Sequence, residues 1–422
     1  MTEKKHIQQG NSDILSIVEA LQIIRANIPE VTPMDCSLQQ SVGKYLAADV
    51  IAPEPSPRYT SSAMDGYAVR WEDVVSAGTQ SPVALKIVGE SQAGLQYENE
   101  VKPGEAVRIS TGAVLARGCD TVVRVEDTSE TGDTVHVKAV RSRGQDVRYK
   151  GEEFAEGELL LNRGKRITAA AAALLAAVGI EKVSICKPCE VALLVTGSEL
   201  VSVGEKIEDD QIRDSNMIML RAAIEDSGGK VTRALRVSDD AEATRRSLDE
   251  TSADIIICSG GISVGRHDHV KKAAEDNGYS AFFWQIRQKP GKPLYFAGKE
   301  KTLLFGLPGN PVSAFMCFTH YVRPVITALN GLAFGWPMVS GEARDDIVNN
   351  VKRPNMIRVR LQWCPNSGYF ITHAARQGSH MLTSLTQADG YIILEPGQRL
   401  RAGERIDVYR YDFLREPCLM ES

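Results

Sequence analysis

The chain has 422 residues, of which 43% are hydrophobic and 24% are charged, and its formal net charge at pH 7 is −5. At typical domain sizes, a chain of this length forms roughly three domains, and its composition is that of an ordinary globular protein. The acidic balance argues against a nucleic-acid-binding protein, which usually presents a basic face, so we expect no nucleic-acid partner.

The cysteines and the N-terminus both favour a reducing, cytoplasmic setting. Eight cysteines are scattered through the chain, and the polar first ten residues lack the apolar core of a signal peptide. Cys186 and Cys189 have C-x-x-C spacing, but no second Cys or His pair completes a zinc site. We therefore interpret this pair as incidental.

The first half of the chain predicts a helix followed by a small β module. Residues 14–28 have apolar side chains at helical spacing, and the proline-rich residues 53–57 indicate a linker or a domain boundary. Short β-like runs separated by Gly and Asp turns follow, at residues 83–88, 106–109, 121–125 and 134–137.

The most hydrophobic stretch is residues 167–180, which is shorter than the roughly 20 residues that cross a bilayer. We expect a buried helix that Thr168 caps and Gly179 ends, and no membrane partner.

The second half predicts an α/β domain and then a second β domain. Strands and helices alternate over residues 190–330, which indicates a parallel sheet with ligand-binding loops after its strands. Residues 331–422 return to short β-like runs and predict a β-barrel or sandwich. The expected strands are 182–186, 191–195, 231–237, 254–258, 357–363, 391–394 and 405–409, and the expected helices are 216–226 and 241–251.

Glycines follow the buried strand that ends near Cys258. Residues 259–265 read Ser-Gly-Gly-Ile-Ser-Val-Gly, and such glycines let backbone N–H groups approach an anion closely. A phosphate site and a tight strand-to-helix turn are equally compatible with this loop alone.

Two stiff turns lie within 25 residues of each other. Residues 289–293 are Lys-Pro-Gly-Lys-Pro, and residues 307–313 are Leu-Pro-Gly-Asn-Pro-Val-Ser. A rigid loop with two lysines loses little entropy when it binds a small anion. Pro311 suits the first turn of a helix running to Thr319, whose N–H groups would add positive potential. Purely structural turns are the alternative, but two turns this close favour an anion site.

Several acids lie beside glycines, turns or strand ends, where carboxylates suit Mg²⁺ shared with a phosphorylated substrate. Taken singly, each is more typical of a cap or a turn. The segment His267-Asp268-His269 has no third histidine nearby, so we expect no zinc site. The sequence has no G-x-x-x-x-G-K-[ST] motif, so we do not expect a P-loop nucleotide-binding site. The acids are Asp65, Asp146, Glu199, Asp214, Asp239 and Asp268.

In this order, the loops resemble the MoeA family of molybdopterin molybdenumtransferases, which includes the E domain of gephyrin. The resemblance extends over about residues 14–415, nearly the whole chain. The matching segments are residues 61–69 (Ser-Ser-Ala-Met-Asp-Gly-Tyr-Ala-Val), 108–113, 118–123, 195–200, 212–216, 259–265, 289–293 and 306–313.

The resemblance implies a multidomain α/β plus β fold with a three-layer α/β molybdopterin-binding domain, a small β module and a C-terminal β-barrel. It implies a homodimer whose active site joins the α/β domain of one subunit to the second domain of its partner. The implied domains are I (residues 1–52 and 145–187), II (53–144), III (188–330) and IV (331–422).

The implied activity is insertion of molybdenum from molybdate into adenylylated molybdopterin, with Mg²⁺-dependent release of AMP. The molybdopterin adenylyltransferase and molybdoenzyme maturation proteins are possible further partners. The resemblance assigns catalytic roles to Asp65, Thr111, Asp146, Glu199, Asp239 and Asp268, with Glu199, Asp239 and Asp268 at the metal. It assigns substrate binding to Thr196, Gly197, Asp214, Ser259, Gly260, Gly261, Ser263, Gly265 and Pro293, and a molybdate pocket to Lys289, Lys292, Ser313, Arg358 and Ser379.

Two departures keep alternatives open. Arg266 stands where the family often has an acid, and Gln285 stands where a lysine is common. A catalytically altered paralogue that serves as a molybdopterin-binding scaffold, or a tungstate-preferring insertase, are the alternatives. The sibling adenylyltransferase shares only the α/β domain, so the additional β domains argue against it.

Overall fold

The structure, a computed structural model, describes residues 14–262 and 269–411. The described chain divides into two compact units. We call residues 35–184 the β unit, and residues 14–34 together with 185–411 the α/β unit.

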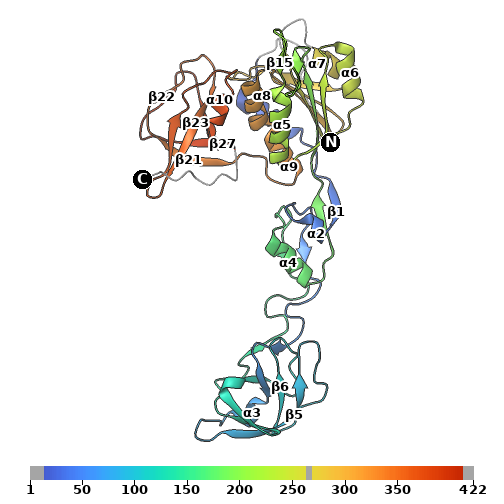
Figure 1. Cartoon of the computed structure of the whole chain (residues 1–422), viewed down its shortest axis with the longest axis vertical. Helices are drawn as coiled ribbons and strands as arrows, with labels where there is room; N and C mark the ends of the chain where they lie inside the picture. The colour runs from blue at the N-terminus through green and yellow to red at the C-terminus, as the bar shows by residue number, and fades with distance from the viewer. Residues whose placement is uncertain (1–13, 263–268, 412–422) are drawn as a thin grey trace. The chain divides into compact units, whose positions relative to one another are not determined.

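A six-stranded sheet forms the larger part of the β unit (Figure 1). Its strand order is β7-β4-β6-β5-β9-β8, and its core consists of inward-facing apolar side chains such as Leu85, Val123 and Val135. The β module expected from the sequence is therefore present. The strands are β4 (Gly66–Val69), β5 (Val83–Ser91), β6 (Glu105–Ile109), β7 (Thr121–Arg124), β8 (Thr128–Thr131) and β9 (Thr134–Val137), with helices α3 (Trp71–Val74) and η1 (Val125–Asp127).

Short strand pairs and two helices complete the β unit. Helix α4 (Ala169–Ala177) begins at Thr168, whose side chain accepts a hydrogen bond from the Ala171 N–H. The expectation of a buried helix was wrong, because only Leu175 of α4 is buried. Few elements of this unit pack against α4, so most of its alanines face outward. The other elements are β1 (Pro33–Ser37) paired with β12 (Lys182–Cys186), β2 (Val50–Ile51) with β11 (Leu159–Leu161), β3 (Ser61–Ser62) with β10 (Val147–Arg148), and α2 (Leu38–Ser41).

The α/β unit contains a second six-stranded sheet with helices on both faces (Figure 1). One core joins this sheet to α1, α5, α8 and α9, and a second core joins its other face to α6 and α7. This confirms the three-layer arrangement. The strand order is β16 (Lys230–Val237), β13 (Glu190–Thr196), β17 (Ile255–Ser259), β20 (Thr302–Leu307), β19 (Tyr295–Lys299) and β18 (Ser280–Trp284). The helices are α1 (Ile17–Ala26), α5 (Ser215–Asp226), α6 (Ala241–Asp249), α7 (His269–Asp276), α8 (Pro311–Cys317) and α9 (Arg323–Leu329), and β14 (Leu200–Val201) pairs with β15 (Ile212–Arg213).

The sequence predicted a parallel sheet, and this was wrong for one strand. β19 runs antiparallel to both of its neighbours, β18 and β20. Only residues 285–294 precede it and residues 300–301 follow it, and these connections carry no helix. Parallel neighbouring strands need a longer crossover connection than these. β19 therefore pairs antiparallel with β18 before it and with β20 after it.

The helix that begins at Pro311 is longer than expected. It passes from α8 through a π-helical turn, η2 (Phe318–Val322), into α9 and ends at Leu329. Its length and hydropathy would suffice to cross a membrane, but 89% of the apolar window lies buried inside the protein. We interpret it as a core helix.

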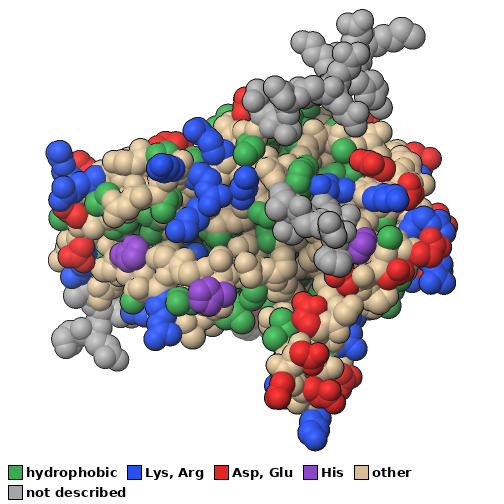
Figure 2. All heavy atoms as spheres, turned by 90° about the horizontal axis from the view of Figure 1, so that it is seen from above, with side chains coloured by type: hydrophobic (Ala, Val, Ile, Leu, Met, Phe, Trp, Pro, Cys, Tyr) green, Lys and Arg blue, Asp and Glu red, His purple; other side chains and the backbone are tan. Residues whose placement is uncertain are grey.

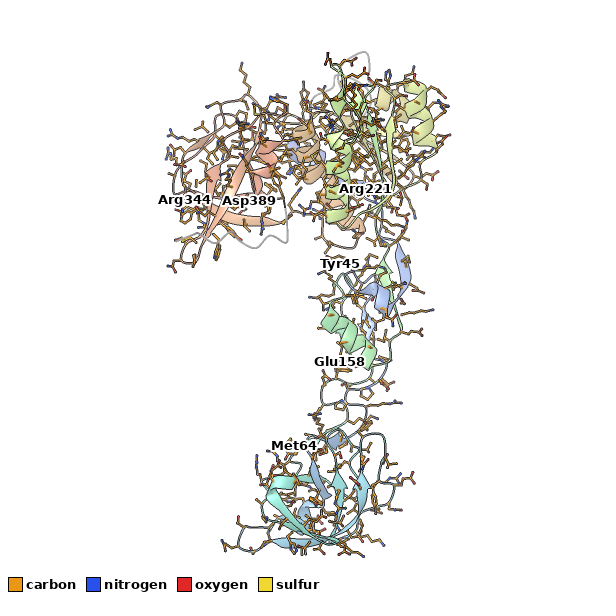
Figure 3. The ribbon with its side chains drawn as sticks, viewed as in Figure 1. Tyr45, Met64, Glu158, Arg221, Arg344 and Asp389 are labelled. Carbon is orange, nitrogen blue, oxygen red and sulfur yellow. The ribbon has the colours of Figure 1, made fainter. Side chains whose placement is uncertain are left out.

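A closed five-stranded barrel, β21-β24-β23-β25-β27, forms the C-terminal part of the α/β unit. Asp389, labelled in Figure 3, stabilises it by accepting a 2.9 Å hydrogen bond from the Leu361 N–H. The elements are β21 (Met338–Ala343), β23 (Asn355–Cys364), β24 (Gly368–His373), β25 (Gly390–Leu394) and β27 (Arg405–Arg410), with α10 (Thr383–Thr386) and the pair β22 (Ile347–Val348) and β26 (Arg399–Leu400).

Candidate active site

Three neighbouring strands of the α/β sheet end together and form the first part of the candidate site. Thr196 ends β13, Ser259 ends β17 and Leu307 ends β20. The Gly260 N–H donates a 3.1 Å hydrogen bond to the Leu307 carbonyl, which ties the glycine loop to the end of β20. Gly260 has a φ of +95°, and a Cβ there would lie 2.5 Å from the Thr196 carbonyl oxygen. Glycine is therefore required where the two strand ends meet.

Two buried polar atoms lack a hydrogen-bond partner among the described residues at these strand ends. They are Thr196 Oγ1 and Asn216 Oδ1. Asn216 lies on α5, and its Nδ2 donates to Ser259 Oγ at 3.0 Å and to the Gly309 carbonyl at 2.8 Å. Since the carbonyl can only accept, the Asn216 amide is oriented with Oδ1 as the remaining acceptor. Unpartnered buried polar atoms are costly unless a ligand satisfies them.

Asp214 caps the helix that carries Asn216. Its side chain accepts a 2.9 Å hydrogen bond from the Met217 N–H, and it is 7% exposed. A structural role therefore accounts for the Asp214 carboxylate.

Gly197 follows Thr196 and is buried beside it. We call Thr196, Asn216, Ser259, Gly260 and Gly309 the strand-end cradle.

Two of the three proposed metal-binding acids, Glu199 and Asp239, lie at the same edge of the sheet. Glu199 follows β13 and is exposed, and Asp239 follows the adjacent strand β16 and is half-buried. Within residues 14–262 and 269–411, no three His, Cys, Asp or Glu side chains form a group that could hold a metal ion. Ser263, Gly265, Arg266 and Asp268 lie outside the described residues.

The loop of residues 289–293, which carries the two lysines, packs along α8. A Cβ on Gly291 would lie 2.4 Å from Cys317 Sγ and 3.5 Å from the Ser313 carbonyl oxygen, so the loop packs directly against this helix. Lys289 and Lys292 are half-buried, as is Pro293, and Ser313 is 5% exposed. The structure thus brings the cationic loop and Ser313 together.

Arg358 lies on β23, which the same loop contacts. The Lys289 N–H donates to the Pro354 carbonyl at 2.9 Å, and the Met356 N–H donates to the Lys289 carbonyl at 2.8 Å. Arg358 is only 1% exposed, yet its Nε and Nη2 have no hydrogen-bond partner among the described residues. Burial lowers the pKa of its guanidinium. A buried cation without a partner is unfavourable, so this geometry favours an anionic ligand.

Ser379 lies in the loop that follows β24 and is half-buried. Gln377 of that loop hydrogen-bonds the backbone of Arg358 in both directions, accepting from its N–H at 3.1 Å and donating to its carbonyl at 2.9 Å. The loop of Ser379 is therefore anchored at Arg358. Lys and Arg side chains also gather on the barrel half of the face shown in Figure 2.

The candidate residues of the β unit form their own group. Asp65 follows Met64, which Figure 3 labels at the edge of the sheet. Asp65 Oδ1 accepts from the Thr111 N–H at 2.7 Å and from Thr111 Oγ1 at 3.1 Å. Asp146 joins them through its backbone, because its carbonyl accepts a 2.8 Å hydrogen bond from the Ala63 N–H.

Asp146 also forms a two-point ion pair with Arg124, with both oxygens 2.8 Å from guanidinium nitrogens. These hydrogen bonds hold the pKa of the Asp146 carboxyl below its usual value. A lowered folded-state pKa contributes stability above the ordinary pKa of about 4, and that contribution is lost as the pH falls through the folded value.

We therefore expect Asp146→Asn to lower the free energy of unfolding of the β unit by about 1 kcal/mol near neutral pH, and by less in acid. Urea unfolding between roughly pH 2 and 6 measures this difference. A deficit that stays constant over the whole range would contradict the ion-pair explanation. Glu152→Gln, which removes a surface carboxylate from the same unit, is the control.

The sequence interpretation missed two members of the cradle. Asn216 ends the segment 212–216, which was singled out as a motif, but only Asp214 was taken from it. Gly309 belongs to the turn 307–313, and its carbonyl holds Asn216. Their positions in motifs were the available signal, whereas the hydrogen bond between them depends on the tertiary fold.

Three family models match successive parts of the chain. Residues 15–179 match the family model of the MoeA N-terminal region (domain I and II), residues 192–328 that of a probable molybdopterin binding domain, and residues 340–411 that of the MoeA C-terminal region (domain IV).

Individual relatives match over most of their length. A protein of Nostoc sp. named molybdopterin molybdenumtransferase is 34% identical over 363 residues, covering 84% of this chain and 83% of the relative. A Haemophilus influenzae protein of the same name is 32% identical over 385 residues, covering 90% and 94%. Two solved structures of a molybdopterin biosynthesis MoeA protein from Pyrococcus horikoshii have TM-scores of 0.83 and 0.75 at 28% and 27% identity, covering 95% and 94% of this chain and 100% of each relative. The chain belongs to the MoeA family of molybdopterin molybdenumtransferases.

Proposed function

We propose that this protein inserts molybdenum from molybdate into adenylylated molybdopterin, with Mg²⁺-dependent release of AMP. The single observation that carries the proposal is the buried guanidinium of Arg358, whose Nε and Nη2 have no hydrogen-bond partner among the described residues, on the strand that the two-lysine loop contacts. Molybdate is a dianion, and charge-assisted hydrogen bonds from Arg358, Lys289 and Lys292 would bind it.

The strand-end cradle suits the organic part of the substrate. Thr196 Oγ1 and Asn216 Oδ1 offer buried hydrogen-bonding atoms. The glycine at position 260 lets the ends of β13 and β17 come close together, because a Cβ there would lie 2.5 Å from the Thr196 carbonyl oxygen. Open α/β sheets bind their ligands at this carboxyl edge.

Glu199 and Asp239 fit Mg²⁺ chemically, since they are carboxylates at the ends of adjacent strands, and Mg²⁺ is commonly held by one or two carboxylates together with substrate phosphates. We propose that these two residues hold the ion together with Asp268. Bound there, Mg²⁺ would neutralise negative charge on the adenylate phosphate. The chain's own contribution is to bind and orient both substrates and to stabilise charge.

Homodimerisation and a cytoplasmic location are further parts of the proposal. The outward-facing alanines of α4 support a covering partner chain, because apolar helices are rarely left exposed. All seven cysteines that the structure describes are free, which suits a reducing compartment. The adenylyltransferase that makes the substrate and the maturation proteins that accept the product would be transient partners. No described residue favours the scaffold or tungstate alternatives, so we do not propose them.

A release assay tests the function. Purified protein is mixed with adenylylated molybdopterin, Mg²⁺ and molybdate, and AMP is followed by chromatography. We expect AMP release that requires both molybdate and Mg²⁺. Tight substrate binding without release under these conditions would contradict the insertase proposal.

A further inference from the structure

A buried polar cluster lies directly beneath the two-lysine loop, in a region otherwise packed with apolar side chains. Gln288 precedes the loop and is 0% exposed. Its Nε2 donates a 3.0 Å hydrogen bond to the Gly291 carbonyl, in the middle of the loop. Its Oε1 accepts a short hydrogen bond from the hydroxyl of Tyr321. Both ends of the Gln288 amide are thus used, one toward the loop and the other toward the core helix.

The core helix supplies the other two members of this cluster. Tyr321 lies in the π-helical turn η2 and is 0% exposed. Cys317, the last residue of α8, places its Sγ 3.6 Å from the Gly291 carbonyl as a second donor. We call Gln288, Tyr321 and Cys317 the loop clamp. π-turns inside helices are often found at functional sites, and here the turn carries the tyrosine that fixes Gln288.

The loop fits tightly against the clamp. Gly291 has a φ of +81°, and a Cβ there would lie 2.4 Å from Cys317 Sγ and 3.1 Å from Gln288 Nε2. The loop ends are held as well, because the Ile286 N–H donates to the Lys292 carbonyl at 2.9 Å. The clamp therefore fixes the middle of a loop whose ends are already anchored.

Polar side chains in an apolar core must repay the cost of burial. An apolar side chain at position 288 would avoid that cost, but it would leave the Gly291 carbonyl with only the weak Cys317 thiol donor. Networks in which each member is hydrogen-bonded rigidify their surroundings. A rigid loop loses less entropy when its lysines engage an anion. Packing alone therefore does not explain why polar side chains occupy these buried positions, whereas rigidity of the loop does.

We propose that Gln288 and Tyr321 are positioning residues that hold the Lys289–Lys292 loop ready for a tetrahedral oxyanion. The proposal rests on the proposed function, since molybdate is the oxyanion concerned. Neither side chain touches the anion in this scheme. Both act through the backbone of Gly291.

The decisive variant is the double substitution Gln288→Met and Tyr321→Phe. Removing both partners of the Tyr321–Gln288 hydrogen bond leaves neither of those side chains unsatisfied, and the Gly291 carbonyl keeps the Cys317 thiol as a weak donor, so the fold should tolerate the double change better than either single change. The matched control is Thr327→Val, which removes a buried hydroxyl that donates to the Pro324 carbonyl farther along the same helix. We would measure the melting temperature, AMP release against molybdate concentration, and hydrogen exchange in the peptide spanning residues 286–294.

A positioning role predicts that the half-saturating molybdate concentration rises about 10-fold in the double variant, with kcat within about twofold of wild type. Exchange over residues 286–294 should accelerate, while the melting temperature falls less than in either single variant and the Thr327→Val control stays near wild type. An unchanged molybdate dependence in the double variant would overturn the proposal and leave the proposed function intact. If the wild-type protein itself shows no molybdate-dependent release, the proposed function fails. In that case hydrogen exchange by itself tests whether the clamp holds the loop rigid. Faster exchange in the double variant would support the clamp, and equal exchange would reject it.

Discussion

Replacing Arg358 with methionine should weaken molybdate-dependent activity severely without weakening the fold. Arg358 is 1% exposed, and its Nε and Nη2 have no partner among the described residues, so an anionic ligand would offset part of the cost of burying this cation. Methionine fills a similar volume without a charge. We expect the half-saturating molybdate concentration to rise at least about 10-fold, because a hydrogen bond to a charged group contributes about 1.5–3 kcal/mol.

The Arg358→Met substitution should not lower the stability of the protein. Without molybdate, the free energy of unfolding of the Arg358→Met variant should equal or exceed that of wild type by about 1 kcal/mol. Added molybdate should raise the melting temperature of wild type more than that of the variant. The control is Arg360→Met on the same strand, because Arg360 is exposed and its Nε already donates to the Gln387 carbonyl at 2.8 Å. Normal molybdate dependence in Arg358→Met would remove Arg358 from the site.

Gly260→Ala should abolish binding of the adenylylated substrate and lower the free energy of unfolding by about 3 kcal/mol or more. Two costs combine at this position. The φ of +95° disfavours any residue with a Cβ by about 1 kcal/mol, and the added methyl would lie 2.5 Å from the Thr196 carbonyl oxygen and 2.7 Å from its hydroxyl. Since these are the atoms of the cradle, relief of the clash must displace them.

Gly278→Ala separates the two costs. Gly278 follows α7 in the same unit and has a φ of +81°, but no atom lies within 4 Å of a Cβ built there. That variant should lose only about 1 kcal/mol and retain substrate binding. Urea unfolding and equilibrium dialysis with the adenylylated substrate measure both effects. Equal losses in the two variants would show that backbone strain alone, and not crowding of the cradle, explains the first result.

Local sequence signals located most of the secondary structure. The β-like run at residues 134–137 coincides with β9, and the run at 182–186 coincides with β12. The Gly-rich and Pro-rich loops also marked the strand-end cradle and the cationic loop, because glycine and proline report backbone conformations that few other residues adopt. The prediction failed at two places: the connections beside β19 are too short for a parallel crossover, and few elements of the β unit pack against α4.

By itself, the sequence determined the family, the order of the domains and the loops that carry the candidate site, since these depend on residue types at fixed spacing. Only the tertiary structure decided which polar groups are left without partners. Arg358 is an ordinary strand residue in the sequence, and its burial depends on the barrel packing against the α/β sheet. Likewise, Gln288 and Tyr321 are 33 positions apart and meet only because η2 lies beneath the loop. Burial and hydrogen-bond satisfaction are properties of the packed chain, which is why no local pattern reveals them.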